Sequence, residues 1–156
     1  MANKFVVVMM GSKSDHPVMD KALAALDSYG IDYECRVLSA HRTPAETQQY
    51  VIDAEARGAQ VFIAAAGMAA HLAGVVAAHT IKPVIGVPIA SGALQGQDAL
   101  LATVMMPPGI PVATVAIDGA KNAAHLAAQM MALSDAELAA RIDEFRDSER
   151  RNILGE

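Results

Sequence analysis

The stretch "KFVVVMMGSKSDHPVMDKALAALDSYG", residues 4–30, contains the pattern that repeats along this chain. Residues 4–10 are almost wholly apolar, which is typical of a strand buried on both faces of a sheet. Residues 16–30 then carry an apolar stripe at helical spacing, formed by Val18, Ala22, Leu26 and Tyr29. Gly30 ends this predicted helix. A strand followed directly by a helix is the first half of a unit whose next strand runs parallel to the first.

The same alternation continues along the chain. Further strands are predicted at residues 32–38, 60–66, 83–89 and 111–117. Further helices are predicted at residues 43–57, 68–79, 97–105 and 120–133. Five strand–helix units predict a single α/β domain over residues 1–156, a three-layer αβα sandwich with an open, parallel, five-stranded sheet of flavodoxin-like order. They are too few for an eight-stranded barrel.

An extra C-terminal helix is predicted beyond the last unit. A capping box from Ser134 to Glu137 begins it, and it extends to about Arg150, with Ile153 and Leu154 beyond. This helix either packs on its own sheet or docks on a neighbouring subunit, and the sequence leaves both arrangements open.

The composition narrows the class of protein. Asp and Glu number 17 against 12 Lys and Arg, and the resulting charge of −5 argues against general nucleic-acid binding. Cys35 is the one cysteine, so no internal disulfide forms, which fits a reducing cytosol. Residues 61–81 are as long as a membrane span, but they are rich in Ala and interrupted by Gly and His. A buried strand and helix explain them better, so we expect a soluble, cytoplasmic protein that binds no membrane.

Small and polar residues follow four successive predicted strands. They are "GSKSD" (11–15), "SAHR" (39–42), "GMAAH" (67–71) and "SGALQG" (91–96). In open parallel sheets, ligands bind beyond the carboxyl ends of the strands. We therefore expect the four loops to border one crevice.

Residues in these loops are suited to binding a phosphate and to transferring a proton. The glycine, two hydroxyls and helix N-terminus of "GSKSD" suit a phosphate, although the spacing is not that of a Walker loop. The guanidinium of Arg42 can donate several hydrogen bonds to the same phosphate. Asp15 would repel a phosphate, so it is better suited to accept hydrogen bonds from sugar hydroxyls. His41, just before a helix predicted from a Thr43–Glu46 capping box, is the candidate acid and base. His71 also has a structural interpretation, as a helix-start residue hydrogen-bonded to a neighbour. No metal-ligand spacing occurs, so we predict no metal and no cofactor.

Five motifs together resemble a known family. They are "MGSKSD" (10–15), "SAHRTP" (39–44), "AAHLAG" (69–74), "GVP" (86–88) and "KNAAHLAAQ" (121–129). In this order and spacing they are similar to the bacterial 5-(carboxyamino)imidazole ribonucleotide mutases of purine biosynthesis, from about Val6 to Phe145. The resemblance implies an isomerase that interconverts a carbamate on the exocyclic amine of an aminoimidazole ribonucleotide with a carboxylate on ring carbon 4. It implies no ATP, metal or organic cofactor, and a homo-octamer in which several subunits complete each site.

The resemblance also implies roles for individual residues. Ribose phosphate binding falls to Ser12, Asp15 and Arg42, with Ser14 and Ser39 nearby. His41 is implied to transfer the proton. The imidazole and carbon dioxide are implied to lie beside Gly67, Ala70, His71 and Leu72. Two residues depart from the family's usual "GAGGAAHLPGM": Met68 replaces a glycine and Ala73 replaces a proline.

Alternatives remain at this level. A related class carboxylates aminoimidazole ribonucleotide directly with carbon dioxide, but Arg42 and His71 favour the mutase. A flavodoxin-like electron carrier would be expected to place aromatic residues in the candidate loops, which contain none. A flavodoxin-like binding module without catalysis is a further alternative. A receiver module needs an Asp at the end of the third strand, where the chain reads "IAAAGM". An Ala-rich structural assembly without catalysis predicts that His41→Asn has no effect.

Overall fold

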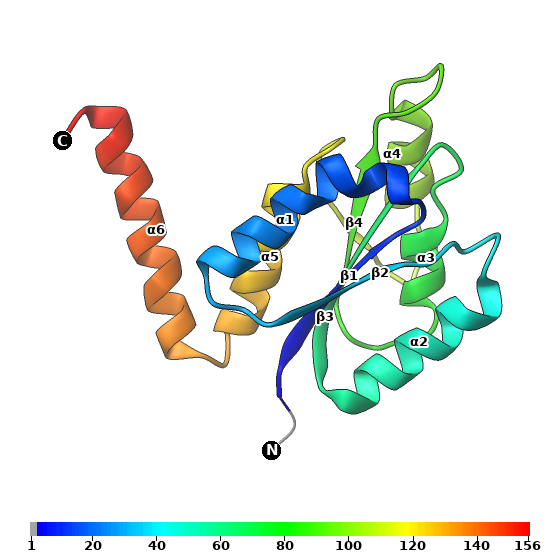
Figure 1. Cartoon of the computed structure of the whole chain (residues 1–156), viewed down its shortest axis with the longest axis horizontal. Helices are drawn as coiled ribbons and strands as arrows, with labels where there is room; N and C mark the ends of the chain where they lie inside the picture. Colours follow the sequence, from blue (N-terminus) through cyan, green and yellow to red (C-terminus); the bar gives the residue numbers. More distant parts are fainter. Residues whose placement is uncertain (1–2) are drawn as a thin grey trace.

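A computed structural model describes residues 3–156 as a three-layer α/β sandwich (Figure 1). The strands are β1 (Phe5–Met10), β2 (Tyr33–Val37), β3 (Ala59–Gly67), β4 (Val84–Ile89) and β5 (Ala113–Thr114). All neighbouring strands are parallel, and their order is β2-β1-β3-β4-β5. This is the flavodoxin-like order. The predicted fold class is confirmed.

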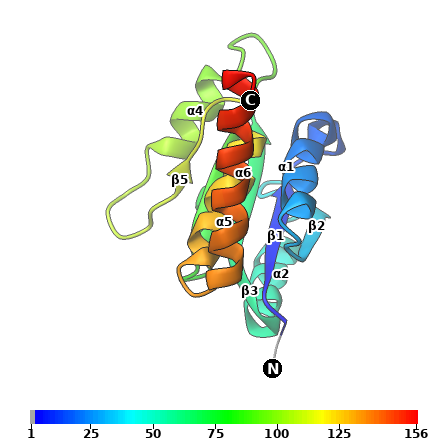
Figure 2. The same cartoon turned by 90° about the vertical axis from the view of Figure 1, so that its left-hand side faces the viewer.

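Helices cover both faces of this sheet. They are η1 (Lys13–Asp15), α1 (His16–Ser28), α2 (Pro44–Arg57), α3 (Leu72–Ala77), α4 (Gln97–Val104), α5 (Ala120–Ala132) and α6 (Ala136–Leu154). Helices α1 and α5 pack on one face, and α2 and α3 pack on the other. Helix α6 lies outside α5, away from the sheet (Figures 1 and 2).

Strand β1 explains why its sequence shows no polar alternation. All six of its side chains are buried. Val6, Val8 and Met10 join the core beneath α1 and α5. Phe5, Val7 and Met9 join the core beneath α2 and α3. The strand is thus apolar on both faces because helices cover both faces.

The structure corrects several predicted boundaries. Helix α3 begins at Leu72 instead of residue 68, because Met68 has a left-handed backbone with φ 53°. In the first turn of α1 the buried side chain is that of Met19, whereas Val18, predicted to lie on the apolar stripe, is only half-buried. Strand β5 has two residues instead of seven, although the Val115 N–H still donates to the Gly86 carbonyl on β4.

Both predicted capping boxes are wrong in detail. The Thr43 hydroxyl makes no cap bond to α2; it accepts from the Ser39 N–H (2.8 Å) and donates to the Ser39 carbonyl (3.0 Å). Helix α6 is capped by Asp135, whose carboxylate accepts from the Leu138 N–H at 3.0 Å, and not by Ser134. The stop at Gly58 is as predicted, with φ 116°.

Helix α6 is partly packed and partly exposed. Leu138 and Ile142 are buried against the α1–α5 core. Further along, Ile153 and Leu154 are 84% and 59% exposed. The first turns therefore pack on the chain's own core, while the last turns extend into solvent. Within residues 3–156, no helix is both long enough and apolar enough to cross a bilayer.

Candidate active site

The four loops at the carboxyl ends of β1 to β4 border one cleft of about 580 Å³. Its lining residues are Gly11, Ser12, Ser14, Asp15, Val18, Ser39, Ala40, His41, Arg42, Ala66, Gly67, Met68, Ala69, Leu72, Ile89, Ala90 and Ser91. A larger hollow of about 920 Å³ lies at the opposite edge of the sheet, around residues that precede β4 and β5. Of the two, only the smaller cleft brings the hydroxyls, imidazole and guanidinium of the candidate loops together.

One end of the cleft is polar. The Ser12 hydroxyl accepts from the Ser14 N–H (3.3 Å) and lies 2.9 Å from the Ser14 hydroxyl. Arg42 reaches back to the end of β1, where its Nη2 donates to the Gly11 carbonyl at 3.0 Å. Its Nε donates to the Ser39 hydroxyl at 3.4 Å. Hydroxyl and guanidinium donors from the first two loops are thus gathered on one wall.

Asp15 is a buried carboxyl beside these donors. It is 6% exposed, and burial raises its pKa above the ordinary value. A hydrogen bond with the Ser12 backbone and the charge of Arg42 act in the opposite direction on this pKa. Asp15 makes no side-chain cap bond to α1. Its carboxyl oxygens are therefore placed to accept hydrogen bonds from a ligand's hydroxyl groups.

His41 and His71 form an imidazole pair beside the cleft. His41 Nε2 lies 2.7 Å from His71 Nδ1, and the rings meet edge to face at 87°. One nitrogen must donate and the other accept, so the tautomers of the two rings are linked. His71 precedes α3, so the predicted hydrogen bond to a neighbour is present, and His41 is the partner. The pair connects the second loop to the third.

Gly67 allows the third and fourth loops to meet closely. A Cβ atom on Gly67 would lie 2.5 Å from the Ser91 hydroxyl oxygen and 3.4 Å from the Ile89 carbonyl oxygen. The fourth loop is also held from below, because Asp118 Oδ1 accepts from the Ala90 N–H at 2.9 Å. The third and fourth loops are therefore closely packed where they border the cleft.

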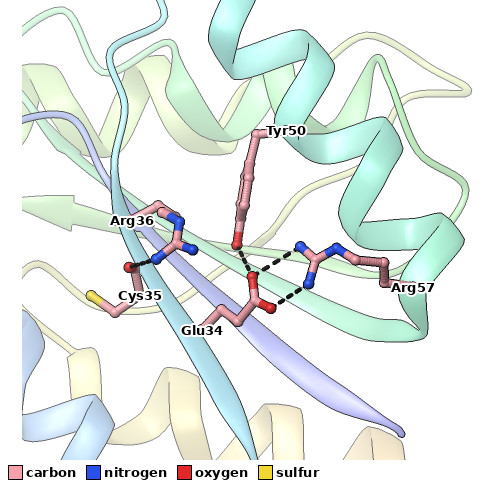
Figure 3. A network of polar contacts seen from close by, with 5 residues as sticks. All are labelled: Glu34, Cys35, Arg36, Tyr50 and Arg57. Atoms are coloured by element: carbon pink, nitrogen blue, oxygen red, sulfur yellow. Dashed lines mark hydrogen bonds and ion pairs between the residues drawn. The ribbon is translucent and has the colours of Figure 1, made fainter. Parts of the chain in front are cut away.

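A polar network between β2 and α2 supports the loop that carries His41. The Tyr50 hydroxyl donates to Glu34 Oε2 at 2.7 Å, and Arg57 donates to both carboxylate oxygens, with Nη2 at 3.0 Å from Oε2 (Figure 3). The hydrogen bonds from Arg57 and Tyr50 lower the pKa of Glu34 to about 2. They also fix α2 against the edge strand. The loop at 38–43 joins these two elements, so the network fixes the strand and the helix that the loop connects.

Comparisons with known proteins identify the family of this chain. The model of the family described as AIR carboxylase matches residues 5–152. The chain belongs to the AIR carboxylase family. It is similar to the N5-carboxyaminoimidazole ribonucleotide mutase of Pyrococcus abyssi, with 53% identity over 146 residues, 94% of this chain and 84% of that protein. The enzyme of the same name from Saccharolobus solfataricus is 54% identical over 149 residues, covering 96% and 94%.

A solved structure has the same fold as this chain. The crystal structure of Treponema denticola PurE superposes with a TM-score of 0.89 at 32% identity, covering 97% of this chain and 95% of that one. The predicted family is thus confirmed from sequence and from structure.

The site residues predicted from the sequence fall into two groups. Those that line the cleft are Ser12, Ser14, Asp15, Ser39, His41, Arg42, Gly67 and Leu72. Ala70 is buried at 1% exposure, and His71 reaches the site only through His41. Ser91 was missed as a site residue, although its place after the fourth strand was the available signal. Among residues 3–156, no three His, Cys, Asp or Glu side chains are grouped to hold a metal ion, and the absence of a metal stays a prediction.

Proposed function

We propose that this chain is an N5-carboxyaminoimidazole ribonucleotide mutase, an isomerase of purine biosynthesis, and that residues 1–156 form one catalytic domain. The relatives that carry this name are about half identical over nearly the whole chain. The observation that supports the chemistry is the cleft itself. It joins a polar end to an apolar end, and His41 and Arg42 both line it.

The polar end suits the ribose phosphate. Arg42 supplies a charged fork of donors, and Ser12, Ser14 and Ser39 supply hydroxyls beside it. In this proposal the buried Asp15 accepts from the ribose hydroxyls, away from the phosphate. The charged end of the nucleotide is thereby anchored, and the imidazole ring extends toward Gly67 and Leu72.

His41 transfers one proton in each of two steps. As imidazolium it donates that proton to the carbamate nitrogen while the carbon–nitrogen bond breaks. The bonding pair stays on nitrogen, and carbon dioxide leaves. Ring carbon 4 then donates its electron pair to carbon dioxide and forms the new carbon–carbon bond. Neutral His41 removes the proton from carbon 4, which restores the aromatic ring, so proton and charge balance without any cofactor.

Retention of carbon dioxide in the site should contribute more to the rate than proton transfer does. Acid–base catalysis by a positioned side chain contributes roughly 10²–10⁴-fold. Holding two reactants together reaches effective concentrations of about 10⁵–10⁸ M. Ala66, Ala69, Leu72 and Ile89 give the cleft an apolar end for this purpose. The transfer of carbon dioxide therefore takes place beside residues 66–72.

We also propose that the enzyme is a cytoplasmic homo-octamer with its sites at subunit interfaces. The exposed Ile153 and Leu154 of α6 support an assembly, because isolated apolar side chains at a helix end gain from being covered. Small-molecule ribonucleotide is the one partner required by the chemistry.

The decisive experiment compares two substrates. Purified chain receives aminoimidazole ribonucleotide with bicarbonate alone, or with the ATP-dependent enzyme that forms the carbamate. Product that needs carbamate formation supports the mutase, whereas equal product from bicarbonate alone supports the direct carboxylase. His41→Asn should lose roughly 10²-fold or more of the turnover. His79→Asn is the matched control, because His79 lies outside the cleft.

A further inference from the structure

Met68 has an unfavourable backbone at the mouth of the cleft. Its φ is 53°, its side chain is 57% exposed, and it lines the cleft. The left-handed region raises the free energy of a residue with a Cβ atom by about 1 kcal/mol or more, whereas glycine adopts it freely. A glycine at this position would remove the strain. An observed backbone outlier beside a site calls for a role for its side chain.

The Met68 side chain spans two loops. Its Cγ and Sδ lie 3.5 Å, and its Cε 3.7 Å, from where a Cβ atom on Gly92 would be. Gly92 belongs to the fourth loop and has φ 68°, so its bare backbone forms the surface on which the thioether rests. Met68 thus extends from the end of β3 toward the loop after β4. Gly67 and Ser91, which also approach each other closely, are the chain neighbours of Met68 and Gly92.

Carbon dioxide needs such a cover more than the nucleotide does. The nucleotide has a phosphate and hydroxyls for the polar end to hold, but carbon dioxide is neutral and small. Only the shape of the apolar end keeps it near ring carbon 4 between the two bond changes. The apolar thioether of Met68, with three rotatable bonds, can fill such a space.

We propose that Met68 is the residue that retains carbon dioxide, closing the apolar end of the cleft between cleavage of the carbon–nitrogen bond and formation of the carbon–carbon bond. The inference rests on the proposed mutase function. It predicts that Met68 raises the fraction of carbon dioxide that is recaptured before it escapes. Met68 takes no part in the proton transfer.

An isotope-exchange experiment tests this assignment. Enzyme in excess converts unlabelled carbamate substrate in a single turnover, in ¹³C-bicarbonate kept in equilibrium with dissolved carbon dioxide by carbonic anhydrase. Mass spectrometry gives the fraction of product carboxylate that carries ¹³C. Retained carbon dioxide leaves the product unlabelled, whereas escape and replacement label it. We expect Met68→Gly to raise the labelled fraction about tenfold, which corresponds to about 1.4 kcal/mol.

Three controls make the outcome interpretable. Met68→Leu keeps an apolar side chain and should stay near the wild-type fraction. Leu94→Ala removes a side chain that is 58% exposed in the same fourth loop but does not line the cleft, and it should also match wild type. Met68→Gly should melt no lower than wild type, because glycine relieves the left-handed backbone. Equal labelling in Met68→Gly and wild type overturns the inference, and so does equal gain in Leu94→Ala. Failure of wild type to convert the carbamate overturns the proposed function instead.

Discussion

Gly67→Ala is the substitution that separates the geometry of the cleft from the stability of the fold. The backbone at Gly67 is outside the left-handed region, so the new methyl group meets only a problem of space. It would lie 2.5 Å from the Ser91 hydroxyl oxygen, about 1 Å short of the roughly 3.5–4.0 Å of an ordinary contact. The hydroxyl must therefore move by about 1 Å, or carry its loop with it.

Two different magnitudes follow from this displacement. Overpacking lowers the free energy of unfolding by about 1–3 kcal/mol, and a hydroxyl that can rotate places Gly67→Ala near 1 kcal/mol. A misplacement of about 1 Å at a reacting centre lowers the rate by roughly 10²-fold. We therefore expect kcat/KM for the carbamate to fall by about two orders of magnitude while the protein remains folded. Urea unfolding and steady-state kinetics measure the two effects separately.

Matched variants decide whether the contact is the cause. In Gly67→Ala with Ser91→Ala, the nearest remaining neighbours lie at 3.4 and 3.5 Å, so the lost stability should return. In Gly11→Ala the new methyl group meets its nearest atom at 3.8 Å, and stability should stay within about 0.5 kcal/mol of wild type. The reasoning is refuted if Gly67→Ala keeps full activity, or if removing the Ser91 hydroxyl restores no stability.

Two further predictions concern the supports of the cleft. The Glu34 carboxyl has a folded-state pKa of about 2, below its unfolded value, so its stabilisation is complete above about pH 5 and is lost as the pH falls toward 2. The full pKa shift corresponds to roughly 3 kcal/mol of folding free energy, which solvent screening at the half-exposed Arg57 reduces to about 1 kcal/mol. Urea unfolding between about pH 5 and pH 2 should show this loss of stability in wild type and not in Glu34→Gln. Gly86→Ala would place a methyl group 2.3 Å from Thr103 Cγ2, so it should lower the free energy of unfolding by about 2 kcal/mol and Tm by roughly 4–8 °C. Adding Thr103→Ser, which removes that methyl and keeps the hydroxyl bond to Ala99, should recover part of the loss, and full loss in the double variant would contradict the packing argument.

The elements that could be predicted from sequence are those with long, regular patterns. The buried run of β1 and the stop of α2 at Gly58 follow from local chemistry, and the structure has both. The start of α3 could not be predicted, because Ala-rich sequence favours helix while the left-handed Met68 and a turn before His71 interrupt it. The pairing of Thr43 with Ser39 competes with its capping bond, and only tertiary context decides between them.

In the candidate site, too, some features could be predicted from the sequence and others could not. Loops at strand ends can be assigned to one crevice from topology alone, since parallel strands end at a common edge. Which residues within a loop face the cleft depends on turns that no short motif specifies. Ala70 lies inside the protein and Ser91 lies on the cleft wall, although both come within three residues of the end of a strand. The contact between His41 and His71 joins residues 30 positions apart and has no local signal.

The cleft also divides along the chain in a way that matters for descent and for redesign. Its polar wall comes from residues 11–42, and its apolar wall comes mainly from residues 66–91. The two walls are thus encoded by two separate segments of the gene. Substitutions in the later segment can change how the one-carbon fragment is handled. The earlier segment, with the residues proposed to bind the nucleotide, can evolve or be redesigned independently.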